Sequence, residues 1–213
     1  GAALMRLLAR RADTVLAVSP DLAEDARRAG ARDVRHAVIP APRRPQEAGE
    51  KRSASDGTGA REATGPGTTE AFTALVIARL APQKGLHDLP DAAALLCGEE
   101  VRILVAGDGP LERELAARIT AEHLPVELLG RREDVPDLLR RADLVLSAAR
   151  WEGQPVALQE ALLAGRAIVA TDAGGTRWVT GTAAHLVPVG DAEALAAAVT
   201  TLRAPLARRR AET

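Results

Sequence analysis

Apolar runs alternate with amphipathic segments along most of the chain, and this alternation predicts its fold. From Phe72 onward, six runs are typical of buried strands: residues 73–78, 101–106, 125–129, 143–147, 166–171 and 184–188. Helical patterns separate or follow them at 86–97, 111–122, 134–142, 155–165, about 175–181 and 191–202. Apolar strands alternating with helices indicate a parallel sheet covered on both faces. The sequence therefore predicts an α/β fold, a Rossmann-like doubly wound parallel sheet, over residues 71–213.

A smaller α/β unit precedes this domain, in residues 1–41. Its expected elements are a helix at 2–11, a strand at 14–19, a helix that begins after an N-cap at Ser19 with Pro20 at N1 and ends near Gly30, and a strand at 35–40. Two short strands and two helices bury too little surface to be stable alone. Because the chain also begins with Gly inside an amphipathic segment, we interpret residues 1–41 as the C-terminal remnant of a first domain.

Residues 42–70 lack any large apolar side chain and consist mainly of Gly, Pro, Ser, Thr, Ala and mixed charges. This composition is typical of a flexible linker and predicts the domain boundary. No function is expected of this segment.

Composition excludes several classes of function. The net charge is −1 and aromatic residues make up 1% of the chain, so neither a basic field nor stacking platforms for nucleic acid are present. Cys97 is the single cysteine, and the four histidines have no spacing typical of metal ligands. No apolar run approaches a membrane span, and we expect a cytoplasmic protein. The basic start "LMRLLARR" could touch a membrane, although a packed helix end is the favoured interpretation.

Polar and glycine residues gather where the predicted strands end. The loops that follow the first five strands are residues 79–85, 107–110, 130–134, 148–155 and 172–176. Three of them are rich in Gly or combine Gly with Pro. Since ligands of open parallel sheets bind at the carboxyl ends of the strands, this edge is predicted to be a binding edge.

Two cations stand in the first of these loops. Arg79 and Lys84 are five residues apart around Pro82, so both can face one point. Two cations beside helix N-termini suit a diphosphate, and the alternative is two solvated charges. Gly107 and Gly109 in "GDGP" are a weaker signal, for which a tight turn before a helix is the favoured interpretation.

The stretch "RWEGQPVALQEALLAG", residues 150–165, places two carboxylates at the start of a helix. Gly153 and Pro155, the latter expected at N1, would allow close approach of a ligand. Glu152 could accept hydrogen bonds from sugar hydroxyls, and Glu160 could reach a ribose in the same way. The alternative is an acid that stabilises the helix dipole and a solvated Glu160.

Four motifs in this order and spacing, "RLAPQKG", "GDGP", "WEGQPVALQEALLAG" and "VATDAGG", resemble family 4 (group 1) retaining glycosyltransferases of the GT-B fold. The resemblance covers residues 72–202, the C-terminal nucleotide-sugar-binding domain, and residues 1–41, whose "ADTVLAVSPDL" and "VIP" resemble the last two strands of the N-terminal domain. The signature pair of acids corresponds to Glu152 and Glu160, and the pair of cations to Arg79 and Lys84.

The resemblance implies roles for these residues. Arg79 and Lys84 would bind the donor diphosphate and stabilise the leaving group, and Glu152 would hydrogen-bond the transferred sugar; these three form the expected catalytic set. Glu160 would hold the ribose, and the Gly130–Arg131 loop would lie beside the base. The other expected donor-binding positions are Gly107, Gly109, Gly153, Gln154, Pro155 and Val156.

The resemblance also implies the reaction. Sugar would pass with retention from a nucleotide-diphosphate sugar, which is a substrate, to an unknown glycan, lipid or small-molecule acceptor, with neither cofactor nor metal. Membrane contact, at the inner face, would come through the missing domain, and the chain alone would be inactive. Two alternatives stay open: a GT-B epimerase or phosphorylase, and a non-catalytic nucleotide-sugar-binding module. The second is suggested by Trp178, in a region where the family usually carries an acid.

Overall fold

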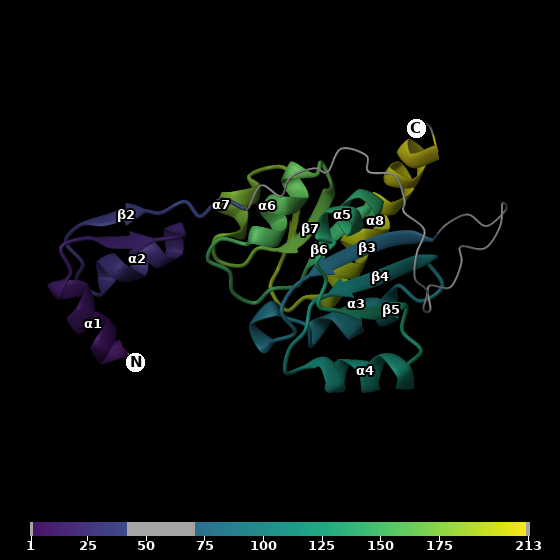
Figure 1. The fold of residues 1–213 in the computed structure, drawn as a ribbon, viewed down its shortest axis with the longest axis horizontal. Coiled ribbons are helices and arrows are strands. Elements are labelled where there is room, and N and C mark those ends of the chain that lie inside the picture. Colours follow the sequence, from purple (N-terminus) through teal and green to yellow (C-terminus); the bar gives the residue numbers. More distant parts are fainter. Residues whose placement is uncertain (1, 42–70, 212–213) are drawn as a thin grey trace, which may run out of the picture.

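The structure is a computed structural model that describes residues 2–41 and 71–211. Its main feature is a sheet of six parallel strands in the order β5-β4-β3-β6-β7-β8 (Figure 1). The strands are β3 (Phe72–Ile77), β4 (Val101–Ala106), β5 (Val126–Gly130), β6 (Leu144–Ser147), β7 (Ala167–Thr171) and β8 (His185–Val187). Counted from β3, this order is 3-2-1-4-5-6, the doubly wound arrangement that the sequence predicts.

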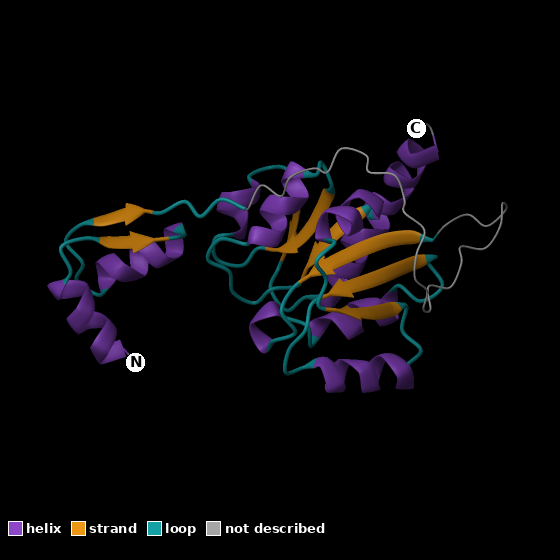
Figure 2. Ribbon diagram, in the orientation of Figure 1, coloured by secondary structure: helices purple, strands orange, loops and turns teal. Residues whose placement is uncertain are grey.

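Helices cover both faces of the sheet, as Figure 2 shows. They are α3 (Asp88–Leu95), α4 (Glu112–Ala121), α5 (Val135–Arg141), α6 (Val156–Leu163), α7 (Thr176–Thr180) and α8 (Ala192–Ala211). One hydrophobic core lies between the sheet and α3, α4 and α8, and includes Leu89, Leu115 and Leu195. A second core lies on the opposite face, against α5 and α6, and includes Leu139 and Leu158.

The central strand shows why two cores form. Successive side chains of a strand point to opposite faces, and in β3 Ala74 and Val76 enter the first core while Leu75 enters the second. Leu75 is fully buried. Because both faces are covered, the strand is apolar at every position but Thr73, which is the pattern that made it recognisable in the sequence.

The structure differs from the sequence-based expectations mainly at the ends of elements. Most bounds shift by one or two residues, as helix ends commonly do. The last helix is the larger correction: it was expected at 191–202, but α8 continues through Pro205 to Ala211. A proline inside a helix removes one backbone hydrogen bond, which is why the pattern suggested an earlier end. A 3₁₀ helix, η1 (Pro82–Lys84), was not anticipated.

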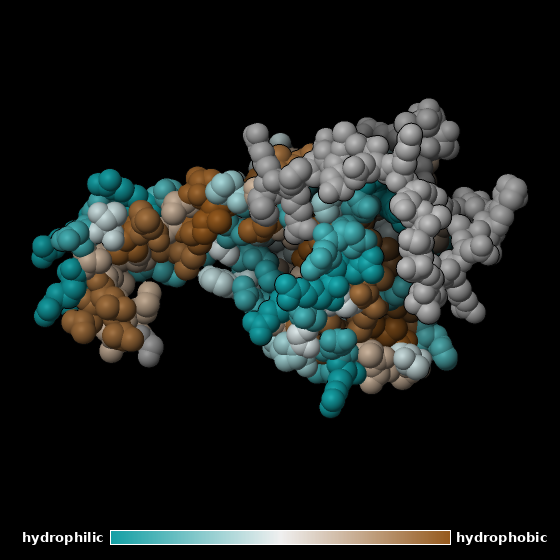
Figure 3. Space-filling view, in the orientation of Figure 1, coloured by the Kyte–Doolittle hydropathy of each residue, from teal (hydrophilic) through white to brown (hydrophobic). Residues whose placement is uncertain are grey.

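The N-terminal unit consists of α1 (Ala2–Arg11), β1 (Val15–Ala17), α2 (Pro20–Arg28) and β2 (Val34–His36), with β1 and β2 parallel. The unit projects from the α6–α7 end of the sheet (Figure 1). Many of its apolar side chains are exposed, among them Leu4, Leu8 and Leu16, and an apolar surface is visible over this unit in Figure 3. The predicted linker, residues 42–70, lies outside the described residues, so the proposed domain boundary stays a prediction.

Candidate functional site

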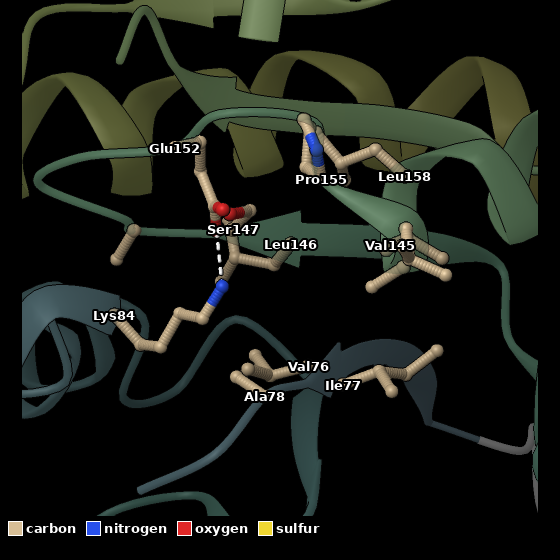
Figure 4. A pocket seen from close by; sticks show the side chains of 13 residues that line it. Val76, Ile77, Ala78, Lys84, Val145, Leu146, Ser147, Glu152, Pro155 and Leu158 are labelled. Carbon is tan, nitrogen blue, oxygen red and sulfur yellow. Dashed lines mark hydrogen bonds and ion pairs between the residues drawn. The ribbon is translucent and has the colours of Figure 1, made fainter. Parts of the chain in front are cut away.

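A small pocket opens at the carboxyl ends of β3 and β6, the two central strands from which the chain winds in opposite directions (Figure 4). The two charged side chains of its lining come from loops that the sequence singles out: Lys84 from the β3–α3 loop and Glu152 from the β6–α6 loop. The remaining lining is Val76, Ile77, Ala78, Val145, Leu146, Ser147, Ala148, Pro155, Val156, Ala157 and Leu158. The cavity measures about 40 Å³, room for only a few water molecules, so a larger ligand must extend over the loops.

Glycine lets the two pocket loops touch. Gly85 ends η1 in the left-handed region with φ of 64°, and a Cβ there would lie 1.7 Å from the carbonyl oxygen of Ala148. The contact is reinforced by a backbone hydrogen bond, in which Arg150 N donates to Gln83 O at 2.9 Å. The Arg150 guanidinium also donates to Asp88 Oδ1 at 2.7 Å, and this bond raises the pKa of Arg150. The β3–α3 loop is thereby held against the β6–α6 loop.

Lys84 and Glu152 form an ion pair across these loops, with 2.5 Å between Nζ and Oε1 (Figure 4). The Glu152 side chain is only 8% exposed and that of Lys84 26% exposed. A buried carboxylate is costly unless it is paired, so Lys84 accounts for the burial of Glu152. An ammonium group has three donors and this bond uses one, so Lys84 retains donors for a second anion.

Arg79, the other predicted cation, is placed on the same loop but is exposed. Within the described residues, no hydrogen bond or ion pair joins it to Lys84, to Glu152 or to another side chain. The structure thus brings Lys84 and Glu152 together, whereas Arg79 is exposed and does not line the pocket.

Gly107 and Gly109 have a structural role at the next loop. Their φ values are 149° and 155°, and Cβ atoms there would lie 1.9 Å from Ala78 O and 2.5 Å from Leu80 O. Backbone hydrogen bonds join the same loops, with Leu80 N donating to Asp108 O at 2.8 Å. These contacts explain why glycine is needed at both positions: the turn packs directly on the β3–α3 loop. The role of the two glycines in donor binding stays a prediction.

The loop that carries Glu152 packs against the β7–α7 loop. Gly175 N donates to Glu152 O at 2.8 Å, and a Cβ on Gly175 would lie 1.8 Å from Gly153 O. Pro155 was expected at the first helical position, but it is the N-cap residue, and α6 begins at Val156. With φ of −70° and ψ of 99°, Pro155 is extended rather than helical. Val156 is partly exposed and lines the pocket.

Two glutamine side chains of this region bind the segment that leaves the N-terminal unit. Gln154 accepts from Ile39 N at 2.5 Å and donates to Ala37 O at 3.0 Å. Gln159 accepts from Ala41 N at 3.0 Å and donates to Ile39 O at 3.1 Å. Sequence reasoning assigned Gln154 a backbone role only and did not single out Gln159, because no local pattern reveals a partner more than 110 residues away.

Glu160 and Arg131 do not line the pocket. Glu160 is half-buried on α6 and takes part in an interaction within the chain, so it is not a freely solvated acid. Arg131 is exposed, whereas its neighbour Arg132 binds Asp134 at 2.6 Å. This bond raises the pKa of Arg132 and lowers that of Asp134. Of the two arginines after β5, Arg131 is therefore the one available to a ligand.

The described residues offer neither a candidate metal site nor a membrane-spanning helix. Residues 2–41 and 71–211 contain no cluster of three or more His, Cys, Asp or Glu side chains that could hold a metal ion. Across the same residues, every helix is too short or too polar to span a bilayer.

A doubly wound sheet with charged and glycine-rich loops at its switch point defines a Rossmann-like ligand-binding domain of the GT-B type. Residues 71–204 match the family model described as glycosyl transferases group 1, and the chain belongs to this family. The resemblance found in the sequence is thereby confirmed.

The curated relatives are bacterial glycosyltransferases. The putative colanic acid biosynthesis glycosyltransferase WcaL of Salmonella typhimurium strain LT2 is 36% identical over 135 residues, which cover 57% of this chain and 33% of that protein. The GDP-mannose-dependent alpha-(1-6)-phosphatidylinositol dimannoside mannosyltransferase of Mycobacterium tuberculosis H37Ra is 35% identical over 150 residues, covering 63% of this chain and 38% of that protein. The matched region thus spans about a third of the length of these relatives.

Solved structures confirm the fold. Anabaena HepE, crystallised with UDP and glucose, matches with a TM-score of 0.75 at 26% identity, covering 96% of this chain and 58% of that chain. Staphylococcus aureus TarM, in a complex that includes UDP, matches with a TM-score of 0.73 over 99% of this chain and 42% of that chain. At 17% identity, the second likeness concerns the fold alone.

Proposed function

We propose that the chain carries the donor-binding half of a retaining glycosyltransferase whose substrate is a nucleotide-diphosphate sugar. The observation that carries this proposal is the Lys84–Glu152 pair at the switch point of the sheet. It sets a cation with spare donors beside a carboxylate that can accept hydrogen bonds from hydroxyl groups. A diphosphate and a sugar are the two parts of a ligand that would use both.

Most of the predicted residues have a role in this proposal. Lys84 and the exposed Arg79 bind the diphosphate and stabilise the charge that grows on it as the glycosidic bond breaks. Glu152 holds the transferred sugar, supported by backbone groups of residues 153–156. Glu160 binds the ribose, and the loop of Gly130 and Arg131 lies beside the base.

Charge stabilisation without a metal is part of the proposal. Two cations and the N-terminal amides of α6 supply positive potential at the point where the leaving group becomes more negative. The HepE complex contains UDP, which supports a nucleotide ligand here. The acceptor, and any contact with a membrane, are assigned to the first domain.

The test is the thermal stability of the chain with UDP, GDP, ADP and their sugar conjugates, without metal. A ligand at 100 times its Kd adds about 2.7 kcal/mol to the free energy of unfolding. We expect stabilisation by one nucleotide, and its loss in the Arg79→Ala/Lys84→Ala double variant. The chain alone is expected to transfer no sugar, so turnover by it would contradict the assignment of acceptor binding to another domain. If no nucleotide stabilises the chain, the donor site is wrong.

A further inference from the structure

Two polar side chains of the N-terminal unit are buried against the candidate sugar loop without a hydrogen-bond partner. Ser19 is fully buried, and its Oγ has no partner among the described residues. Asp21 is partly buried, and its Oδ1 is likewise buried and unpartnered in that part of the chain. Buried polar atoms are almost always hydrogen-bonded, so two unpartnered buried oxygen atoms within three residues require an explanation.

Capping of α2 does not provide that explanation. Ser19 occupies the N-cap position that the sequence predicts, with φ of −153° and ψ of 159°, but its side chain caps no backbone amide. Pro20 at N1 has no N–H to be capped. An N-cap serine normally accepts from the amide of N2 or N3, so its hydroxyl here is free for another partner.

The surface that faces these side chains is the glycine backbone beside Glu152. A Cβ built on Gly175 would lie 2.9 Å from Ser19 Cβ, and one on Gly174 would lie 3.3 Å from Asp21 Oδ2. The Gly174 position is also 2.2 Å from Glu152 O. Ser19 and Asp21 therefore form a wall opposite the loop assigned to the transferred sugar. The residues that face this wall are glycines, so only backbone separates it from Glu152.

The chemistry of this wall selects the class of ligand. A hydroxyl both donates and accepts, a carboxylate accepts, and the first turn of α2 offers amide donors. The carboxylate opposes a phosphate, and Glu152, already paired with Lys84, leaves too few acids for a cation site. An uncharged ligand with several hydroxyl groups matches this set of donors and acceptors.

We propose that Ser19 and Asp21 are carbohydrate-binding residues that complete the sugar site from the N-terminal side when the two walls part to admit the ligand. This inference rests on the proposed function, because Glu152 must hold a sugar for the facing wall to reach it. The shared chemistry is a sugar hydroxyl, which either the transferred sugar of the donor or the sugar of an acceptor can supply.

The experiment compares the affinity of the chain for UDP, GDP and ADP with that for their glucose and mannose conjugates, by titration calorimetry. The increase in affinity due to the sugar is the quantity of interest. We expect Asp21→Asn and Ser19→Ala to reduce this increase, the former by about tenfold, with unchanged affinity for the bare nucleotide. The matched control is Asp25→Asn, on the same helix, where the carboxylate is exposed and pairs with Arg28 at 3.0 Å.

A second arm distinguishes the sources of the hydroxyl. The chain saturated with nucleotide is titrated with free glucose, mannose, galactose and N-acetylglucosamine, and binding is read by saturation-transfer NMR. A defect of the variants in the first arm assigns the wall to the donor sugar, and a defect confined to the second assigns it to the acceptor.

The inference is overturned if both variants behave as the wild type in both arms, or if no sugar adds to wild-type binding in either. Thermal unfolding guards against misfolding, since removal of an unpartnered hydroxyl should not lower the stability of Ser19→Ala. Absence of nucleotide binding by the wild type is a different result, which removes the proposed function and this inference with it.

Discussion

Lys84 and Glu152, 68 residues apart in the chain, meet at 2.5 Å between Nζ and Oε1 above the two central strands. The pair joins the loop assigned to phosphate with the loop assigned to sugar. In the ligand-free chain, each group is the counter-charge of the other. Under the proposed function, a donor would share Lys84 with Glu152, and both loops would respond to its binding.

The first prediction concerns this pair. Glu152→Gln removes the counter-charge of Lys84, so we expect the affinity for bare nucleotide to rise about threefold while the gain from the attached sugar is lost. The free energy of unfolding should fall by about 1–2 kcal/mol because a buried ion pair is broken. Calorimetric titration and urea denaturation measure the two effects. Equal losses of affinity for nucleotide and conjugate would contradict the division of roles.

The second prediction concerns the contact between the pocket loops. Gly85→Ala places a methyl group within 1.7 Å of Ala148 O at a φ of 64°, so the loops must separate. We expect a loss of more than about 2 kcal/mol of unfolding free energy, measured by urea denaturation. Gly98→Ala is the matched control, since φ there is 86° but nothing lies within 4 Å, and it should cost about 1 kcal/mol. Similar losses in both variants would show that backbone strain alone matters.

The third prediction concerns the glutamine contacts with residues 37–41. Gln154→Ala should expose the amide of Ile39 to hydrogen exchange, and Gln159→Ala that of Ala41, because each loses its acceptor. Exchange measured by NMR should show each effect separately. Gln83→Ala, which removes a bond to Trp151 O, is the control that leaves both amides protected. Unchanged exchange in the two test variants would mean that the segment does not lie against α6.

The fourth prediction concerns pH. The Arg132 guanidinium holds the pKa of Asp134 below its ordinary value, so this carboxylate stabilises the fold above about pH 4, the ordinary range of an Asp. The contribution is lost as the pH falls through the folded pKa, because the unfolded chain takes up the proton first. Asp134→Asn should be less stable than the wild type at neutral pH and should converge with it in acid. Unfolding midpoints between pH 2 and pH 7 that stay parallel would rule out this linkage.

The sequence predicted the sheet because its strands are buried on both faces. Runs that are apolar at nearly every position, such as β4, need no alternation to be recognised, and β4 has the bounds expected, Val101–Ala106. The last helix was harder, since Pro205 interrupts the pattern and the structure continues to Ala211. Local pattern gives the identity of an element more readily than its end.

The candidate site was predictable as a set of residues but not as a set of contacts. Lys84 and Glu152 each stood out after a strand, yet nothing in their spacing indicated that they pair with each other. The contacts of Ser19 with Gly175, and of Gln154 with Ile39, join segments far apart in the chain. Such contacts depend on how the two units pack against each other, and the periodicity of the sequence does not indicate that packing.

The order of strands also determines when the site can exist during synthesis. β3 is the first of the six strands to leave the ribosome, yet it occupies the middle of the sheet. Its second neighbour, β6, is synthesised much later. Thr73 N in β3 donates to Asp143 Oδ2, just before β6, across 70 residues of chain. Under the proposed function, a nascent chain that has released Arg79 and Lys84 consequently has no complete nucleotide site until β6 and α6 follow. Products that terminate before residue 144 should retain both cations and bind nothing.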